Sequence, residues 1–231
     1  MIKFGNTELT DIAPVKIDDI EVSPISFEPV TRQRAIRFGA DFVRMGGGTR
    51  TVTVTFALLT TEDREEYLQA IRDWAVTDRE QTLALPLYEN RHLECVCTQH
   101  PDASFRKWWE GKLRLVFTCY NNPYWTSDQL TEVPCGTQFT VGGSAPPLMT
   151  IERAGDTAIQ NAKYISGDAT MEFTTLPAGN VVIDLNRQTA AIGDTSIMRY
   201  YKPNSTWIVP KIGAMQTITG NGTIKYRERW V

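Results

Sequence analysis

The chain has 231 residues, 4 cysteines and a formal net charge of -3 at pH 7. That length is long for a single hydrophobic core, so two domains are expected, and the acidic balance disfavours a nucleic-acid binder that relies on its own positive field. The cysteines are too few for a disulfide framework. No apolar run approaches the roughly 20 residues that span a bilayer, and no signal-peptide stretch opens the sequence, so we expect a protein that stays in the cytosol of the producing cell.

The first half of the chain predicts strands around one amphipathic helix. Residues 15–27 predict a weaker pair of strands, and residues 51–59 alternate threonine with apolar side chains, as a half-buried strand does. Thr60 is expected to cap a helix over about 61–77, where apolar residues recur at helical spacing. Three further alternating segments are expected to be strands: residues 82–88, 92–98 and 112–120.

A polar, arginine-rich segment, residues 28–50, separates the early strands and includes three consecutive glycines. It is expected to be either a long projecting hairpin or a mobile loop. Its arginines could be solvated, form a nucleic-acid patch, or form one side of a charged contact between subunits. Isolated surface ion pairs contribute only roughly 0–1 kcal/mol, so a subunit interface would need many at once, as a closed ring provides. The candidate interface residues are Arg32, Arg34, Arg37, Phe38 and Arg44.

Turn-forming residues at positions 121–125 end the first half, which predicts two domains, 1–125 and 126–231. From Phe139 onward, short strands alternate with glycine and proline, and no helix is predicted. This pattern indicates an antiparallel β-sandwich. The expected strands are residues 149–152, 170–174, 180–185, 189–192, 196–201 and 207–210.

The last stretch of the sequence predicts a β-hairpin. Asn221 and Gly222 can supply the two positive-φ positions of a two-residue turn, with residues 218–219 leading in and 223–231 leading out. Glu228 breaks the apolar row of the second strand, so it is expected at a sheet edge or beside an arginine. The opposite face carries three cations, which form a candidate docking edge: Lys225, Arg227 and Arg229.

The clearest candidate for site chemistry combines two imidazoles with two thiols, His92, Cys95, Cys97 and His100, the usual ligands of zinc. On a strand the two cysteines share one face and the two histidines the other, so a tetrahedral site would need breaks in the strand. We therefore favour core cysteines and predict no metal or cofactor. No nucleophile elbow, phosphate loop, dinucleotide fingerprint or metalloprotease motif occurs, so no catalytic residues and no enzymatic activity are predicted.

The order of these segments resembles the distal tail proteins (Dit, the siphophage tail component family) of long-tailed, non-contractile bacteriophages or prophages. In the first half the resemblance lies in residues 48–56, the single helix and residues 117–125. In the second half it lies in residues 180–187, 205–208, Gly213 and residues 219–230. The resemblance implies a mainly β structural virion protein, with a β-barrel-like, tail-tube-like N-terminal domain flanked by one helix and a galectin-like C-terminal β-sandwich.

The same resemblance implies a hexameric ring that joins the tail tube to the tail tip or baseplate and serves host adsorption. The implied partners are further copies of the chain, the tail-tube protein, tail-tip, baseplate or tail-fibre proteins, and the tape-measure protein. DNA would pass through the ring without specific binding, since an acidic lumen lets it slide. The implied location is the virion tail tip, after assembly in the host cytoplasm and without a membrane.

An alternative interpretation is a carbohydrate-binding module that recognises a host cell-wall glycan through the C-terminal sandwich. An exposed aromatic ring on that sandwich, such as Trp207, could serve as a sugar platform. Of the adjacent Trp108 and Trp109 in the first half, one could be core and the other could meet a partner. For any single tryptophan, ordinary core filling is the competing interpretation.

Overall fold

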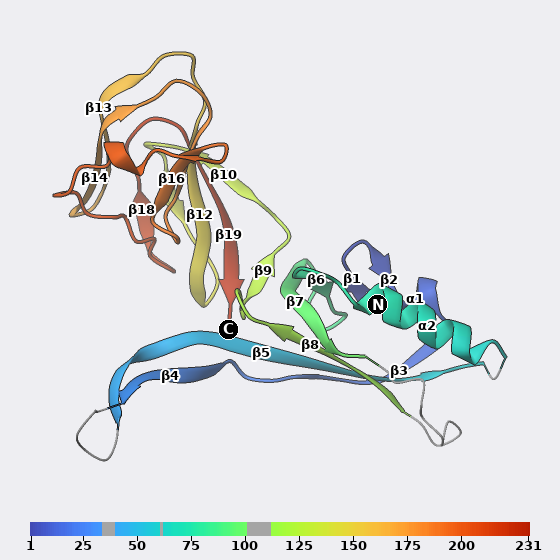
Figure 1. Ribbon diagram of the computed structural model, residues 1–231. Helices are drawn as coiled ribbons and strands as arrows, with labels where there is room; N and C mark the ends of the chain where they lie inside the picture. The colour runs from blue at the N-terminus through green and yellow to red at the C-terminus, as the bar shows by residue number, and fades with distance from the viewer. Residues whose placement is uncertain (34–39, 61, 101–111) are drawn as a thin grey trace. The chain divides into compact units, whose positions relative to one another are not determined.

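The computed structural model describes residues 1–33, 40–60, 62–100 and 112–231, with only the backbone described for 28–33 and 40–47 (Figure 1). The chain divides into two compact units, Met1–Trp125 and Thr126–Val231. Trp108 and Trp109 lie outside the described residues.

Long strand β5 organises the first unit. The strands of this unit are β1 (Lys3–Phe4), β2 (Thr7–Glu8), β3 (Val15–Val22), β4 (Ser26–Gln33), β5 (Ala40–Leu58), β6 (Gln81–Ala84), β7 (Arg91–Gln99) and β8 (Leu113–Cys119). β3 and β8 flank the second half of β5, and β7, β6, β1 and β2 continue the sheet from β8. Along the described residues this path is antiparallel and open, so the mainly β prediction is confirmed, with an open sheet in place of a closed barrel.

The first half of β5 pairs differently. Residues 40–49 of β5 are hydrogen-bonded along β4, and among the described strands they have no other partner. Together β4 and residues 40–49 form a two-stranded arm, which continues past the end of β3 in Figure 1. Of the two alternatives for the polar segment, the structure therefore bears out the hairpin.

Two helices lie in the described part of this unit, α1 (Leu9–Ile12) and α2 (Arg64–Ala75). α2 buries Leu68, Ile71 and Ala75, as its spacing predicts. The predicted cap is wrong: Asp63 precedes the helix with φ 52°, and Thr60 Oγ1 instead accepts a 3.2 Å hydrogen bond from the Glu62 amide. Thr60 is used in a local turn, so the helix begins three residues later than about 61.

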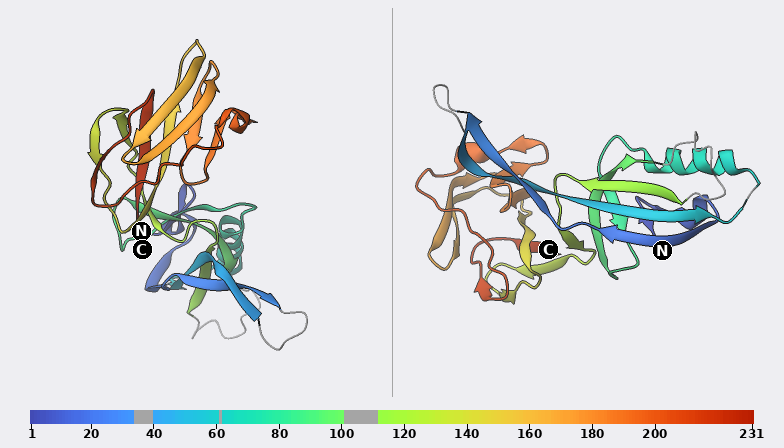
Figure 2. Two further views of the ribbon diagram at one scale, coloured as in Figure 1. Left: turned by 90° about the vertical axis from the view of Figure 1, so that its left-hand side faces the viewer. Right: turned by 90° about the horizontal axis from the view of Figure 1, so that it is seen from below.

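The second unit contains one larger sheet and two strand pairs. Its strands are β10 (Thr131–Pro134), β11 (Gln138–Thr140), β12 (Ala145–Arg153), β13 (Ile159–Ser166), β14 (Ala169–Leu176), β15 (Val181–Asp184), β16 (Thr189–Ile192), β17 (Thr195–Ser196), β18 (Met215–Thr217) and β19 (Thr223–Trp230), while β9 (Trp125–Ser127) crosses the boundary. The larger sheet runs β17-β16-β15-β12-β19-β10, and the pairs are β11-β18 and β13-β14. The left view of Figure 2 shows the β13-β14 pair in yellow-orange and orange.

One core joins the two sets of strands. Ile151, Ile183 and Ile224 from the larger sheet and Tyr164 and Phe173 from the β13-β14 pair are all fully buried in it. Side chains that alternate in toward a shared core from two sets of strands form a sandwich-like unit.

Two strand predictions in this unit are wrong. The segment 196–201 turns into a short 3-10 helix, Met198–Tyr200, after β17 ends at Ser196. Residues 207–210 form no strand, although Ile208 is fully buried. In both places apolar residues attach a connecting segment to the core without forming strand hydrogen bonds. Buried residues in such a segment give the same apolar sequence pattern as a strand.

The predicted terminal hairpin is also wrong. β19 pairs with β12 and β10, whereas Thr219 bridges to Ile165 of the β13-β14 pair. The positive φ angles belong to Gly220 (148°) and Gly222 (127°), not to Asn221. The segment 220–222 therefore carries the chain from one sheet to the other, and does not return it within one sheet.

Candidate functional site

The arm of the first unit holds part of the predicted interface. In the β4-β5 register, Arg32 lies opposite Asp41 and Arg44 lies opposite Val30. Both candidate arginines therefore sit on the two-stranded arm. Arg34, Arg37 and Phe38 fall outside the described residues.

Lys225 of the predicted docking edge does not lie at a sheet edge, because β10 and β12 flank residues 223–226 of β19. The three cations of the predicted docking edge bind groups of their own unit. Lys225 Nζ lies 3.0 Å from Glu152 Oε2 and 3.1 Å from Glu132 Oε1, and these contacts raise the pKa of Lys225. Arg227 Nη1 donates to the Ser127 carbonyl at 2.9 Å and to that of Asp128, and Arg229 Nε donates to the Pro146 carbonyl. The sequence pattern showed the charges but not their partners, which lie far away along the chain.

Glu228, which breaks the apolar row, has a structural role that the sequence did not predict. Its Oε1 accepts a 2.7 Å hydrogen bond from the Gly142 amide. A Cβ at position 142 would lie only 2.6 Å from that oxygen, so glycine allows this close approach. The Ser144 amide donates to the Arg229 carbonyl at 2.9 Å, and Ser144 Oγ accepts from the Val231 amide at 3.0 Å. The loop 142–144 thus holds the last residues of the chain.

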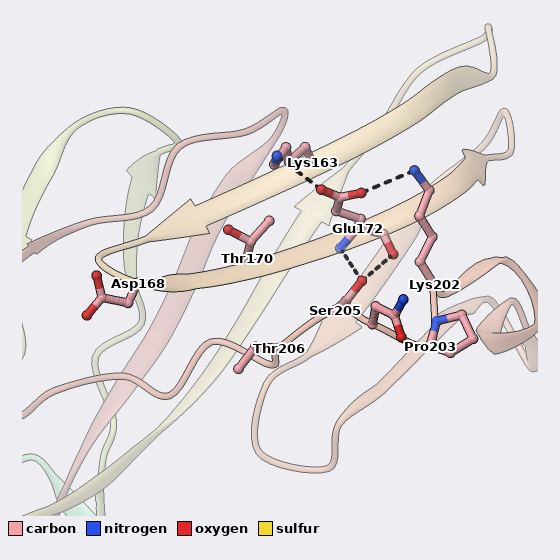
Figure 3. Close-up of a pocket in the computed structure, with 9 residues that line it drawn as sticks. Lys163, Asp168, Thr170, Glu172, Lys202, Pro203, Ser205 and Thr206 are labelled. Atoms are coloured by element: carbon pink, nitrogen blue, oxygen red, sulfur yellow. Dashed lines mark hydrogen bonds and ion pairs between the residues drawn. The ribbon is translucent and has the colours of Figure 1, made fainter.

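A polar cleft of about 560 Å³ lies on the second unit (Figure 3). Glu172 is at its centre and receives Lys163 Nζ at 3.0 Å and Lys202 Nζ at 3.1 Å on its two carboxylate oxygens. Hydrogen bonds from Lys163 and Lys202 hold the pKa of Glu172 below its usual value. Ser205 Oγ accepts from the Glu172 amide at 3.1 Å, which ties the loop after the 3-10 helix to β14. The two lysines thus share one carboxylate, which links β13, β14 and the loop after the 3-10 helix.

A neighbouring cleft of about 690 Å³ shares Asp168 and Thr206 with the first and is lined by Trp207. The Trp207 ring stacks on Tyr201, with centroids 5.0 Å apart and planes at 16°. Trp207 is thus both packed against the core and open to a cleft.

The first unit holds three of the four cysteines, and all four are free thiols. Cys95 is fully buried beside Leu93, as the alternation of β7 predicts, and Cys97 is half-buried. A hydrogen bond to Cys119 and burial raise the pKa of Cys95, and burial raises that of Cys97 to about 11. Nowhere in the described ranges do three or more His, Cys, Asp or Glu side chains converge so that they could hold a metal ion. None of the helices described has the length and apolarity needed to cross a membrane.

Two antiparallel β units, one bearing a two-stranded arm and a single amphipathic helix, define a two-part β fold. The chain shares this fold with the Dit (gp 19.1) protein of phage SPP1, described as a paradigm of the hub adsorption apparatus in phages that infect Gram-positive bacteria. The TM-score is 0.71 at 16% sequence identity, over 100% of this chain and 98% of that one. The predicted resemblance to distal tail proteins is thereby confirmed at the level of the fold.

Weaker likenesses connect the chain to a component of the phage P2 baseplate in its activated conformation. The baseplate structure with Ca gives a TM-score of 0.44 at 9% sequence identity, and the structure with Sr gives 0.44 at 10%. Each match covers 94% of this chain and 91% of that chain. No protein-family model matches the sequence, and no curated protein matches it as a relative.

Proposed function

We propose that this protein is a non-enzymatic structural component of a phage tail, the ring-shaped hub between the tail tube and the tail tip or baseplate. The observation that carries the proposal is the fold shared with SPP1 Dit over the full length of this chain. In this account the protein is a virion component assembled in the host cytoplasm. Its partners are further copies of itself, the tail-tube protein, the tape-measure protein and tail-tip or tail-fibre proteins.

The first unit is the ring-forming, tail-tube-like part, and its arm reaches a neighbouring subunit. Residues 40–49 of β5 pair with β4 alone among the described strands, so the arm is held to its unit at one end. A charged two-stranded extension suits a contact that is repeated around a closed ring. The galectin-like second unit lies on the outside of the ring and serves adsorption, with the cations of β19 as a candidate docking surface on the face of its sheet.

The arm assignment is tested by reversing its charges. Sedimentation of the purified chain with Arg32→Glu and Arg44→Glu should show the loss of the ring and a folded monomer. Arg79→Glu is the matched control, because Arg79 is exposed and lies outside the arm. Deleting residues 34–44 should also abolish the ring. Rings that persist in the charge-reversed and deleted proteins would refute the arm assignment.

A second candidate function, recognition of a host cell-wall glycan, is favoured by one observation: Trp207 lines an open cleft on the second unit. Binding of purified wall glycan by the full chain, with loss of that binding in Trp207→Ala, would support it. Equal binding by both proteins, or binding by neither, would refute it.

A further inference from the structure

Four residues of the first unit form a row across neighbouring strands. Gln81 of β6 is opposite Cys95 of β7, and Arg50 of β5 is opposite Cys119 of β8. Val96 of β7 is opposite Thr118 of β8. One step further along that antiparallel register, Cys95 faces Cys119. The row therefore places two thiols side by side with a guanidinium next to one of them.

The contacts agree with the register. Cys95 and Cys119 are both fully buried, and their side chains are hydrogen-bonded to each other. Directly opposed residues of an antiparallel pair have Cα atoms roughly 4.5–5.5 Å apart, which falls within the range of about 4.4–6.8 Å that disulfides use. The other two cysteines are placed differently: Cys97 is opposite Phe117, and Cys135 belongs to the second unit.

Arg50 is an unusual neighbour for a thiol pair. Only 4% of its surface is exposed, and its Nε and Nη1 atoms have no hydrogen-bond partner. Burial lowers the pKa of Arg50. A buried, incompletely paired cation is costly, and a thiolate beside it would lower that cost. The structure thus provides a counter-charge for the Cys119 thiolate, the form that attacks disulfides.

We propose that Cys95 and Cys119 are a redox-active pair that forms a disulfide between β7 and β8 in an oxidising solution that supplies a small disulfide. This inference does not depend on the proposed function. The Cys119 thiolate attacks one sulfur of the small disulfide, whose S–S bond breaks and releases one small thiol. The Cys95 sulfur, after losing its proton, then attacks the Cys119 sulfur and releases the second small thiol. Two protein thiols are oxidised, and one small disulfide is reduced to two thiols.

Access to the pair depends on the end of β8. Cys119 is the last residue of that strand, and the next residue, Tyr120, is 54% exposed. The Glu80 carboxylate holds this end, accepting from the Tyr120 amide at 3.0 Å and the Asn121 amide at 3.1 Å. Local opening of a strand end costs less than global unfolding, so reagents reach Cys119 from this side.

The test exposes the native full-length chain to hydroxyethyl disulfide, blocks the remaining thiols by alkylation and maps the cysteines by proteolysis and mass spectrometry. We expect two of the 4 thiols to be lost and a peptide linking Cys95 to Cys119, lighter by the two hydrogen atoms removed. Cys97→Ser should give the same linked peptide, and Cys119→Ser should leave the Cys95 thiol free. The linked peptide is sought in the native chain, without any substitution. Poor folding of a serine variant therefore does not affect the main result.

Glu80→Ala separates slow access from lack of reactivity, since it releases the end of β8. We expect the linked peptide to form several-fold faster in this variant than in the parent chain. If Cys95 and Cys119 stay free in both proteins while Cys97 is modified, the proposal is overturned. Mixed disulfides on the two cysteines without a link between them would overturn it as well.

Discussion

The hydroxyl of Tyr164 donates a 2.9 Å hydrogen bond to the backbone carbonyl of Asn221, at the point where the chain leaves the β13-β14 side for β19. The Tyr164 ring lies against Gly220, where a Cβ would approach the ring to 2.2 Å. Tyr164 is fully buried, and burial raises its pKa. One core side chain thus fixes the crossing that places β19 between β10 and β12.

Removing the hydroxyl tests this role. Tyr164→Phe keeps the ring but leaves the Asn221 carbonyl without this donor, so the unfolding free energy should fall by about 1–2 kcal/mol in urea denaturation. Tyr226→Phe is the comparison variant, because its hydroxyl makes a longer contact, 3.3 Å to the Thr140 carbonyl, beside a hydrogen bond with the Thr131 side chain. A larger loss in the comparison variant would contradict the assignment.

Adding a methyl group at the crossing should be more damaging. Gly220→Ala combines a positive φ of 148° with the clash against Tyr164, and we expect a loss of roughly 3 kcal/mol or more. Gly167→Ala is a control without either severe effect, because Gly167 has φ 57°, in the left-handed region that other residues can adopt, and open space around its Cβ position. That control should cost only about 1 kcal/mol in the same assay. Equal losses would mean that the ring contact is unimportant.

Glu228 should be the residue that holds the loop 142–144. Glu228→Ala removes the acceptor of the Gly142 amide and should lower the unfolding free energy by about 1–3 kcal/mol. Glu228→Gln keeps an acceptor oxygen and should lose less than half as much. If the glutamine variant is as unstable as the alanine variant, the hydrogen bond does not explain the choice of residue.

The Lys163-Glu172-Lys202 cluster should make stability depend on pH in the acid range. The pKa of Glu172 is lowered in the folded state, so its contribution is complete above the unfolded pKa and is lost as pH falls through the folded value. Between about pH 5 and pH 3, the urea midpoint should fall more in the parent chain than in Glu172→Gln. Identical pH profiles would contradict the cluster's role.

The sequence predicts best where a strand has one buried face. Val52, Val54 and Phe56 alternate with threonines and are fully buried, and this segment lies in β5 as predicted. The same holds for Leu115 and Phe117 in β8. Apolar and polar residues alternate here because one face of the strand is buried, so these strands can be predicted from the local sequence pattern alone.

Partner strands and long-range contacts could not be predicted in this way. Asn221 and Gly222 form a turn signal that depends only on neighbouring residues. Because β18 pairs with β11 and β19 pairs with β12, the chain instead passes from one sheet to another at these residues. Likewise the partners of Lys225 lie on β10 and β12, and no local pattern contains them. The register that sets Cys95 beside Cys119 also depends on which strands are neighbours, information that period and composition lack.

The central claim is that the chain assembles into a ring, and the most direct measurement is negative-stain electron microscopy of the purified protein at high concentration, with its mass measured in the same solution. Our account predicts closed six-fold rings with the mass of a hexamer. A monomer at every concentration, which no tail-tube protein can recruit into a larger assembly, would contradict it.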